Sequence, residues 1–291
     1  MSAIIQLTFD GSFLHDGHKV SLRVLSHTMS SLQAASDRAF LDVKYGDVSK
    51  HQKLPYQYYE EADFIVGDPR EGSYLIDFIS RNGAAIVRRM KSAITDPYEK
   101  SLKGADIQIY QISHQVTGKK EQIKRGDIEP IDFEKLSSDQ LKLVTRTYGD
   151  KSINKEFDRL LSPVRRNDGS FLRLVLKPDA DEEAKSFDFD QTIAKNFKNI
   201  ISKRELGDPI IYHGKLRLLD HGHNRRTNLR GKFINVENDK DVVLNIQSKE
   251  DFDRLVPYIQ SQEVFTIIAC PIIEFSSHDP VGGDIQFIEI V

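Results

Sequence analysis

Apolar and polar residues alternate at the start of the chain. The apolar members recur at every second position in two short runs, Ile5, Leu7 and Phe9 and then Val20, Leu22 and Val24. Because successive side chains of a strand point to opposite faces, this period of two predicts two strands, each with one buried face. The spacing then becomes helical over roughly residues 27–44, and the hydroxyl of Ser26 can cap that helix.

Two further apolar runs, at residues 63–67 and 73–80, predict a second pair of strands. The N-terminal region therefore has the order β-β-α-β-β, which is typical of an antiparallel sheet covered by helix on one face. Helical spacing follows at residues 84–94. Residues 103–116 fit a helix, which we favour, or a strand, because their periodicity does not separate the two.

The middle of the chain is mainly helical before the pattern changes. Residues 133–161 have helical spacing, with a break expected near Gly149. A strand is predicted at residues 171–176, an exposed acidic loop or linker at 178–183, and another helix near 187–202.

The last part of the chain has the clearest pattern. It predicts strands at residues 209–219, 229–236, 242–246, 263–275 and 284–290, and a helix that Ser248 caps. One helix between the third and fourth strands is the order of an OB-like five-stranded barrel, and Gly214 suits the bend by which such a barrel closes. A plain antiparallel meander with an inserted helix is the alternative.

The predicted fold class is therefore α+β, with an N-terminal antiparallel sheet and helices followed by an OB-like barrel. We expect an N-terminal domain at residues 1–162, a connecting strand, acidic linker and helix at 163–205, and the barrel at 206–291. A chain of 291 residues is long enough for two domains of ordinary size.

Composition and charge indicate the cellular compartment and the kinds of partner to expect. The single cysteine, Cys270, can form no internal disulfide, and its apolar neighbours indicate a buried, inert thiol in a reducing compartment. No leader pattern and no apolar run of about eighteen residues occurs, so we expect a cytoplasmic protein without membrane association. The formal net charge of −3 argues against whole-surface attraction to nucleic acid, which leaves local patches as the informative feature.

The strongest local concentration of basic charge lies between His213 and Lys232. Its candidate nucleic-acid-binding residues are Lys215, Arg217, Arg225, Arg226, Arg230 and Lys232. The connection between strands one and two of an OB barrel and the outer faces of strands two and three commonly bind oligonucleotides. Tyr212 and Phe233 are candidates for base stacking, although strand alternation can bury either one. A solvated hairpin is the alternative reading of the whole segment.

The same segment contains weak candidates for metal ligands, Asp220, His221 and His223. Two imidazoles and a carboxylate suit zinc or manganese. The two histidines flank a glycine in a predicted turn, however, and no second His or Cys cluster follows nearby, so a polar turn is favoured and no cofactor is expected. The acidic residues near 179–190 could serve a nuclease, but an acidic linker has the same pattern.

Other chemistry finds little support in the sequence. A Gly-x-Ser-x-Gly elbow and a phosphate-binding loop are both absent, so no catalytic residue is predicted. Gly72 in the segment Arg70-Glu-Gly-Ser-Tyr74 allows a turn that binds an anion, although a hairpin connection is favoured. Residues 81–125 form a second basic tract, which we interpret as an exposed helix face. The alternative is that this tract forms part of a shared binding surface.

Three short segments resemble a bacterial two-domain family of unassigned activity: Leu7-Thr-Phe-Asp-Gly, Arg70-Glu-Gly-Ser-Tyr and the closing barrel. They lie in the first eighty and last eighty residues and are structural in character. The resemblance implies a bacterial intracellular protein, and it supplies no catalytic residue that could be carried over.

Three hypotheses remain open. In the first, a non-catalytic protein engages single-stranded nucleic acid through the barrel, while the N-terminal domain holds a protein partner or a second copy. In the second, both domains bind proteins within a larger bacterial assembly, for which the resemblance suggests antiviral defence. In the third, the chain is a metal-dependent hydrolase that uses His221, His223 and nearby acids.

Overall fold

A computed structural model describes residues 2–16, 19–46, 48–49, 52–67, 74–104, 112–136, 138–222, 229–278 and 283–291, and for residues 138–147 it describes the backbone alone. The chain divides into two compact units, which are described separately. Unit 1 comprises residues 1–48, 52–107 and 149–202, and unit 2 comprises residues 49–51, 108–148 and 203–291. Each unit therefore combines segments that are far apart in the sequence.

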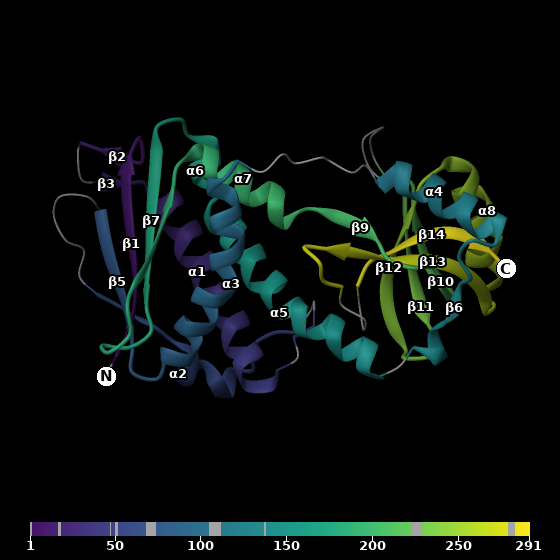
Figure 1. Cartoon of the computed structure of the whole chain (residues 1–291), viewed down its shortest axis with the longest axis horizontal. Helices are drawn as coiled ribbons and strands as arrows, with labels where there is room; N and C mark the ends of the chain where they lie inside the picture. The colour runs from purple at the N-terminus through teal and green to yellow at the C-terminus, as the bar shows by residue number, and fades with distance from the viewer. Residues whose placement is uncertain are drawn as a thin grey trace. The chain divides into compact units, whose positions relative to one another are not determined.

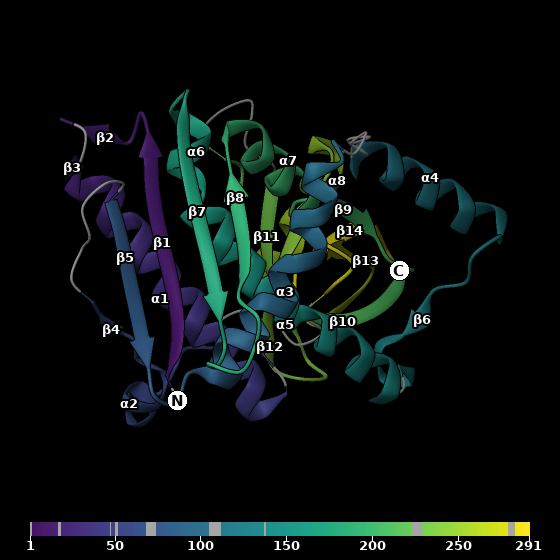
Figure 2. The same ribbon diagram turned by 60° about the vertical axis from the view of Figure 1, so that its left-hand side comes forward.

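Unit 1 is an antiparallel sheet with its helices on one face (Figure 1, Figure 2). In the order β4-β5-β1-β7-β8, its strands are β4 (Ile65–Val66), β5 (Tyr74–Ser80), β1 (Ala3–Gly11), β7 (Ser170–Lys177) and β8 (Lys185–Phe189). A separate hairpin pairs β2 (Leu14–His15) with β3 (Lys19–Val20). The helical segments are α1 (Leu22–Tyr45), η1 (Tyr56–Tyr58), α2 (Tyr59–Ala62), α3 (Ala84–Leu102), α6 (Ser162–Arg166), α7 (Gln191–Ile201) and the C-terminal part of α5 (Ser138–Leu160).

The core of unit 1 lies between the sheet and these helices. Alternate residues of β1, from Ala3 to Phe9, are buried, as the period of two predicts. Tyr98 of α3 joins the edge strand β8 to this core. Its ring packs edge-on against Phe187 and Phe189 at centroid distances of 5.1 and 5.2 Å, and its hydroxyl accepts a hydrogen bond from the backbone N of Asp188 at 3.1 Å.

The second N-terminal strand is shorter than the alternation predicts. Leu22 and Val24 form the first turn of α1, so their assignment to a strand is wrong. Ser21, not Ser26, caps this helix, because its Oγ accepts a hydrogen bond from the backbone N of Val24 at 3.3 Å. Three alternating apolar residues are too few to distinguish a strand from a helix start.

Two other predictions in unit 1 are corrected by sheet pairing. Residues 187–189, predicted as helix, belong to β8, and α7 begins only at Gln191. Strands β7 and β8, which the sequence places in a connecting segment, extend the N-terminal sheet through the pairing of β7 with β1. The acidic residues 178–183 connect these two strands.

Helix α5 continues through Gly149, where the sequence predicts a break. A Cβ on Gly149 would lie 2.4 Å from Oδ1 of Asp42 in α1. The glycine therefore permits a close approach between helices and does not end one. The guanidinium of Arg89 binds the carboxylates of both Asp42 and Asp150, with an Nη1–Oδ1 distance of 2.6 Å to Asp150.

The ambiguous stretch 103–116 is a turn at residues 103 and 104 and helical at residues 112–116. Residues 103 and 104 follow the end of α3, and residues 112–116 begin α4 (Ile112–Arg125), which belongs to unit 2. Residues 105–111 lie outside the described part of the chain.

Unit 2 contains a closed five-stranded barrel. Its strands are β10 (Ile210–Asp220), β11 (Leu229–Asn235), β12 (Lys240–Ile246), β13 (Phe265–Glu274) and β14 (Ile285–Ile290). The order around the barrel is β10-β11-β12-β14-β13, and β13 pairs with β10 to close it. Strands β12 and β14 are parallel, and α8 (Lys249–Ser261), capped by Ser248, connects β12 to β13. The OB-like prediction is confirmed, and a plain meander is wrong.

Gly214 lies where β10 changes partners. Residues 210–214 pair with β13, whereas residues 214–220 pair with β11. A Cβ on Gly214 would lie 2.2 Å from the carbonyl oxygen of Ile234 and 2.4 Å from Cζ of the buried Phe233. Closure of the barrel therefore requires a residue without a side chain at this position.

Three short elements and α4 surround the barrel: β6 (Ile131–Asp132), η2 (Phe133–Lys135) and β9 (Arg204–Leu206). Strand β9 extends the sheet beyond β13, and the side chain of Gln115 in α4 binds its backbone. Its Oε1 accepts from the backbone N of Leu206 at 2.8 Å, and its Nε2 donates to the carbonyl oxygen of Arg204 at 3.3 Å. These bonds satisfy groups that an edge strand would otherwise leave free.

Helix α4 also creates a second small core on the outside of the barrel wall. Its Ile112, Val116 and Ile123 pack with Leu206, Ile268, Cys270, Ile272 and Ile288. Figure 1 shows α4 beside β14. Cys270 is fully buried here, and this burial raises the pKa of its thiol to about 12.

We expect Gly214→Ala to lower the free energy of unfolding by about 3 kcal/mol, because the added methyl group overpacks a rigid strand crossing. The matched control is Gly118→Ala in α4, where no atom lies within 4 Å of an added Cβ. This control should be neutral or stabilise by up to about 1 kcal/mol, since alanine favours a helix. Urea denaturation followed by circular dichroism measures both, and equal stability of the two variants would contradict the role of Gly214.

We expect the Cys270 thiol not to react with Ellman's reagent at pH 8 in the folded protein, because the thiol is buried and its pKa is high. In guanidinium chloride the single cysteine should react fully. Absorbance of the released thiolate measures both states. Reaction of the folded protein at the rate of a free thiol would show that α4 does not pack as described.

Candidate functional site

The outer surface of β10, β11 and β12 is left uncovered by α4. Among the described residues, the apolar cluster under α4 draws on β9, β13 and β14 and on none of these three strands. Inward positions of β10 to β12 fill the barrel core, as Leu216, Phe233 and Leu244 do. Their outward positions lie on the side of an OB barrel that commonly binds oligonucleotides.

Three of the predicted basic residues point outward from this surface. Lys215 of β10 and Arg230 and Lys232 of β11 are all exposed. Lys215 lies opposite Ile234, so the three cations form a diagonal row across the two strands. Within the described residues, none of the three forms an ion pair with an acid. We define the outward positions of β10, β11 and β12 as the basic face.

Arg217 also projects from β10, but it reaches an acid on β12. Its Nη1 lies 2.9 Å from Oδ2 of Asp241, and the side chains are 63% and 39% exposed. An ion pair this exposed contributes little to stability. A phosphate group could therefore displace Asp241 at small cost.

The loop between β10 and β11 contains other predicted residues. Arg225, Arg226 and His223 lie outside the described residues. The loop follows Asp220, the last residue of β10, and precedes Leu229, the first residue of β11, at one end of the basic face.

The prediction that two aromatic residues are available on the surface for base stacking is wrong. Tyr212 and Phe233 both face inward and are buried in the barrel core. Burial raises the pKa of the Tyr212 phenol. The Tyr212 ring contacts Phe133 at 5.5 Å, and the Phe233 ring contacts Phe265 at 5.8 Å.

The outward positions between the cations are aliphatic, which sequence reasoning did not identify. They are Leu218, Ile234 and Val243, and Leu218 is 45% exposed. A register shift between Leu216 and Leu218 turns Leu218 outward, although strict alternation would bury it. The positions of Ile234 and Val243 could have been read from alternation in β11 and β12.

The predicted metal ligands do not assemble a site in the described part of the chain. His221 packs its ring on Phe252, at a centroid distance of 4.6 Å, and Asp220 accepts a hydrogen bond from the backbone N of Gly222 at 2.9 Å. No group of three His, Cys, Asp or Glu side chains suited to a metal ion occurs among the residues that are described.

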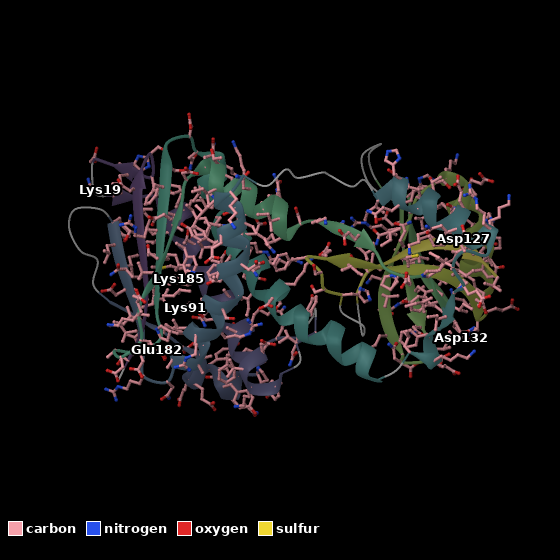
Figure 3. The ribbon with its side chains drawn as sticks, in the orientation of Figure 1. Lys19, Lys91, Asp127, Asp132, Glu182 and Lys185 are labelled. Carbon is pink, nitrogen blue, oxygen red and sulfur yellow. The ribbon has the colours of Figure 1, made fainter. Side chains whose placement is uncertain are left out.

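In the part of the second basic tract that lies in unit 1, Arg88 and Lys91 bind an acid and a backbone carbonyl group of the same unit. Arg88 pairs with Glu182 of the acidic connection, and this hydrogen bond lowers the pKa of Glu182. The Nζ of Lys91 donates to the carbonyl oxygen of Glu183 at 2.8 Å. Figure 3 shows Lys91 and Glu182 on the same side of unit 1. These cations hold the acidic connection against α3.

The lysines of α4 are likewise used in packing. Lys119 lies 3.2 Å from Asp208, and Lys120 lies 2.9 Å from Asp251. The Asp251 side chain is only 6% exposed, so Lys120 neutralises a buried carboxylate near the start of α8. Lys119 and Lys120 therefore stabilise the fold through ion pairs, unlike the row of three cations on the basic face, which pairs with no described acid.

The strand order and the basic face define the class of this chain: an α+β protein whose second unit is an OB-like barrel. No family model, curated protein or solved structure matches it. The resemblance to a bacterial two-domain family therefore gains no support. Across the described residues, no helix has the length and apolar character of a membrane span.

We expect Lys120→Ala to lower the free energy of unfolding by roughly 2 kcal/mol, because it removes the closer of the two cations at the buried Asp251 carboxylate and leaves only Arg254, at 4.0 Å. Lys124→Ala in the same helix is a matched control. Urea denaturation measures the difference between them. Equal effects of the two substitutions would argue against the structural role of Lys120.

Proposed function

We propose that the barrel of unit 2 binds single-stranded nucleic acid on the basic face and the adjoining loop at residues 221–228. The observation that carries this proposal is the row of Lys215, Arg230 and Lys232 on the uncovered side of an OB-like barrel. Arg217, Arg225 and Arg226 would add positive charge around the same ligand. The role is one of binding, without a catalytic step.

The spacing of the cations supports this ligand. Arg230 and Lys232 are two residues apart on one strand, which separates them by about 7 Å. Adjacent phosphates of an extended nucleic acid strand are similarly spaced. A strand lying across β11 could therefore place successive phosphates near both side chains and then near Lys215.

Charge balance also supports a local electrostatic site. The chain as a whole carries a formal charge of −3, so it should not attract nucleic acid over its entire surface. None of the three cations in the row on the basic face forms an ion pair with a described acid, whereas Arg88 and Lys120 do. Binding should therefore be confined to this face and depend strongly on salt.

We expect Arg230→Glu with Lys232→Glu to weaken binding of a fluorescent dT20 oligonucleotide at least tenfold at low salt, because two phosphate contacts become repulsive. The neutral pair Arg230→Gln and Lys232→Gln should flatten the slope of log Kd against log salt by roughly 1.4, at about 0.7 per lost contact. Fluorescence anisotropy across a salt series measures both effects.

A matched control reverses two exposed lysines of unit 1, Lys100→Glu and Lys195→Glu, which changes the net charge by the same amount. It should bind almost as well as the natural protein. Equal losses in both double variants, or no binding by the natural protein at low salt, would overturn the proposal. Co-purification of a fixed protein partner after nuclease and high-salt treatment, without oligonucleotide binding, would favour the protein-interaction hypothesis instead.

A further inference from the structure

We infer that the basic face recognises the phosphate and sugar backbone of single-stranded nucleic acid and does not read or stack its bases. This inference rests on the proposed function and specifies its substrate class. It predicts binding without sequence preference, and equally good binding to a strand from which the bases have been removed.

The residue types at the outward positions carry the inference. Along the described parts of β10, β11 and β12, these positions contain Lys, Arg, aliphatic and small polar side chains, with the acids Asp220 and Asp241 and the half-buried His213. Neither phenylalanine nor tyrosine occurs among them. Both aromatic residues of these strands, Tyr212 and Phe233, are buried in the core. The described surface therefore offers a base no phenylalanine or tyrosine ring. The half-buried imidazole of His213 is hydrogen-bonded through Nδ1 to Oγ1 of Thr266, at 2.9 Å.

The sequence of the adjoining loop agrees with this arrangement. Residues 221–228 read His-Gly-His-Asn-Arg-Arg-Thr-Asn, and the chain contains no tryptophan. The connection between β13 and β14 holds one aromatic residue, Phe275, which is half-buried and whose backbone N donates to the carbonyl oxygen of Lys203 at 3.1 Å. Base stacking in OB-type sites normally relies on several exposed rings.

The aliphatic residues have a different use in this arrangement. Leu218 pairs with Lys232 across β10 and β11, and Val243 pairs with Lys232 across β11 and β12. Lys232 therefore lies between two apolar residues on the neighbouring strands. Such a surface fits a backbone in which charged phosphates alternate with the less polar carbons of the sugars.

Removing a stacked base commonly costs roughly fivefold to more than a hundredfold in affinity. An abasic 20-mer with tetrahydrofuran sugars has the same phosphates as dT20 but nothing to stack. We expect the full-length protein to bind dT20, dA20 and the abasic 20-mer within threefold of one another, with equal salt slopes. Anisotropy competition at low salt measures the three affinities.

If the abasic strand bound more than threefold more weakly than dT20 while dT20 bound tightly, the inference would be overturned and the proposed function would stand. Failure of all three strands to bind would overturn the proposed function itself. Val243→Tyr tests the path of the ligand, because it adds a ring beside Lys232. This variant should bind dT20 at least threefold more tightly than the abasic strand, and an unchanged ratio would place the ligand away from β12.

Discussion

The close approach of β10 to β11 at Gly214 is the constraint on which the second unit depends. Only a residue without a side chain leaves room for the carbonyl oxygen of Ile234 and the ring of Phe233. The exchange of strand partners at this point turns an open sheet into a closed barrel. Closure then gives every strand an inward face and an outward face, and separates the apolar core from the basic face.

Coverage by α4 gives the two sides of the barrel wall different roles. On β9, β13 and β14 the helix builds a second apolar core and binds the free edge of β9 through Gln115. On β10, β11 and β12 the outward cations remain exposed. The same residue type therefore has two uses: Lys120 neutralises a buried acid, whereas Lys232 stands on an open surface.

In unit 1, a cluster of basic residues in the sequence does not form a free basic surface, because the fold pairs its members with other groups. Arg88, Arg89 and Lys91 form a basic cluster in the sequence, but each binds an acid or a carbonyl group of its own unit. Such pairs orient the acidic connection and α5 against α3. Charge density along a chain therefore indicates a binding surface only where the fold leaves the charges without partners.

The sequence by itself determined the elements of the barrel, because alternation in long strands, the cap at Ser248 and the bend at Gly214 are local signals that the tertiary structure preserves. It also located the basic residues of the face. The tertiary structure alone decided that Gly149 permits a close approach between α5 and α1 and does not end a helix, and that residues 170–189 extend the first sheet. It likewise buried Tyr212 and Phe233, and turned Leu218 outward. Those outcomes depend on which segments pack together, and contacts between distant residues leave no periodic pattern in the chain.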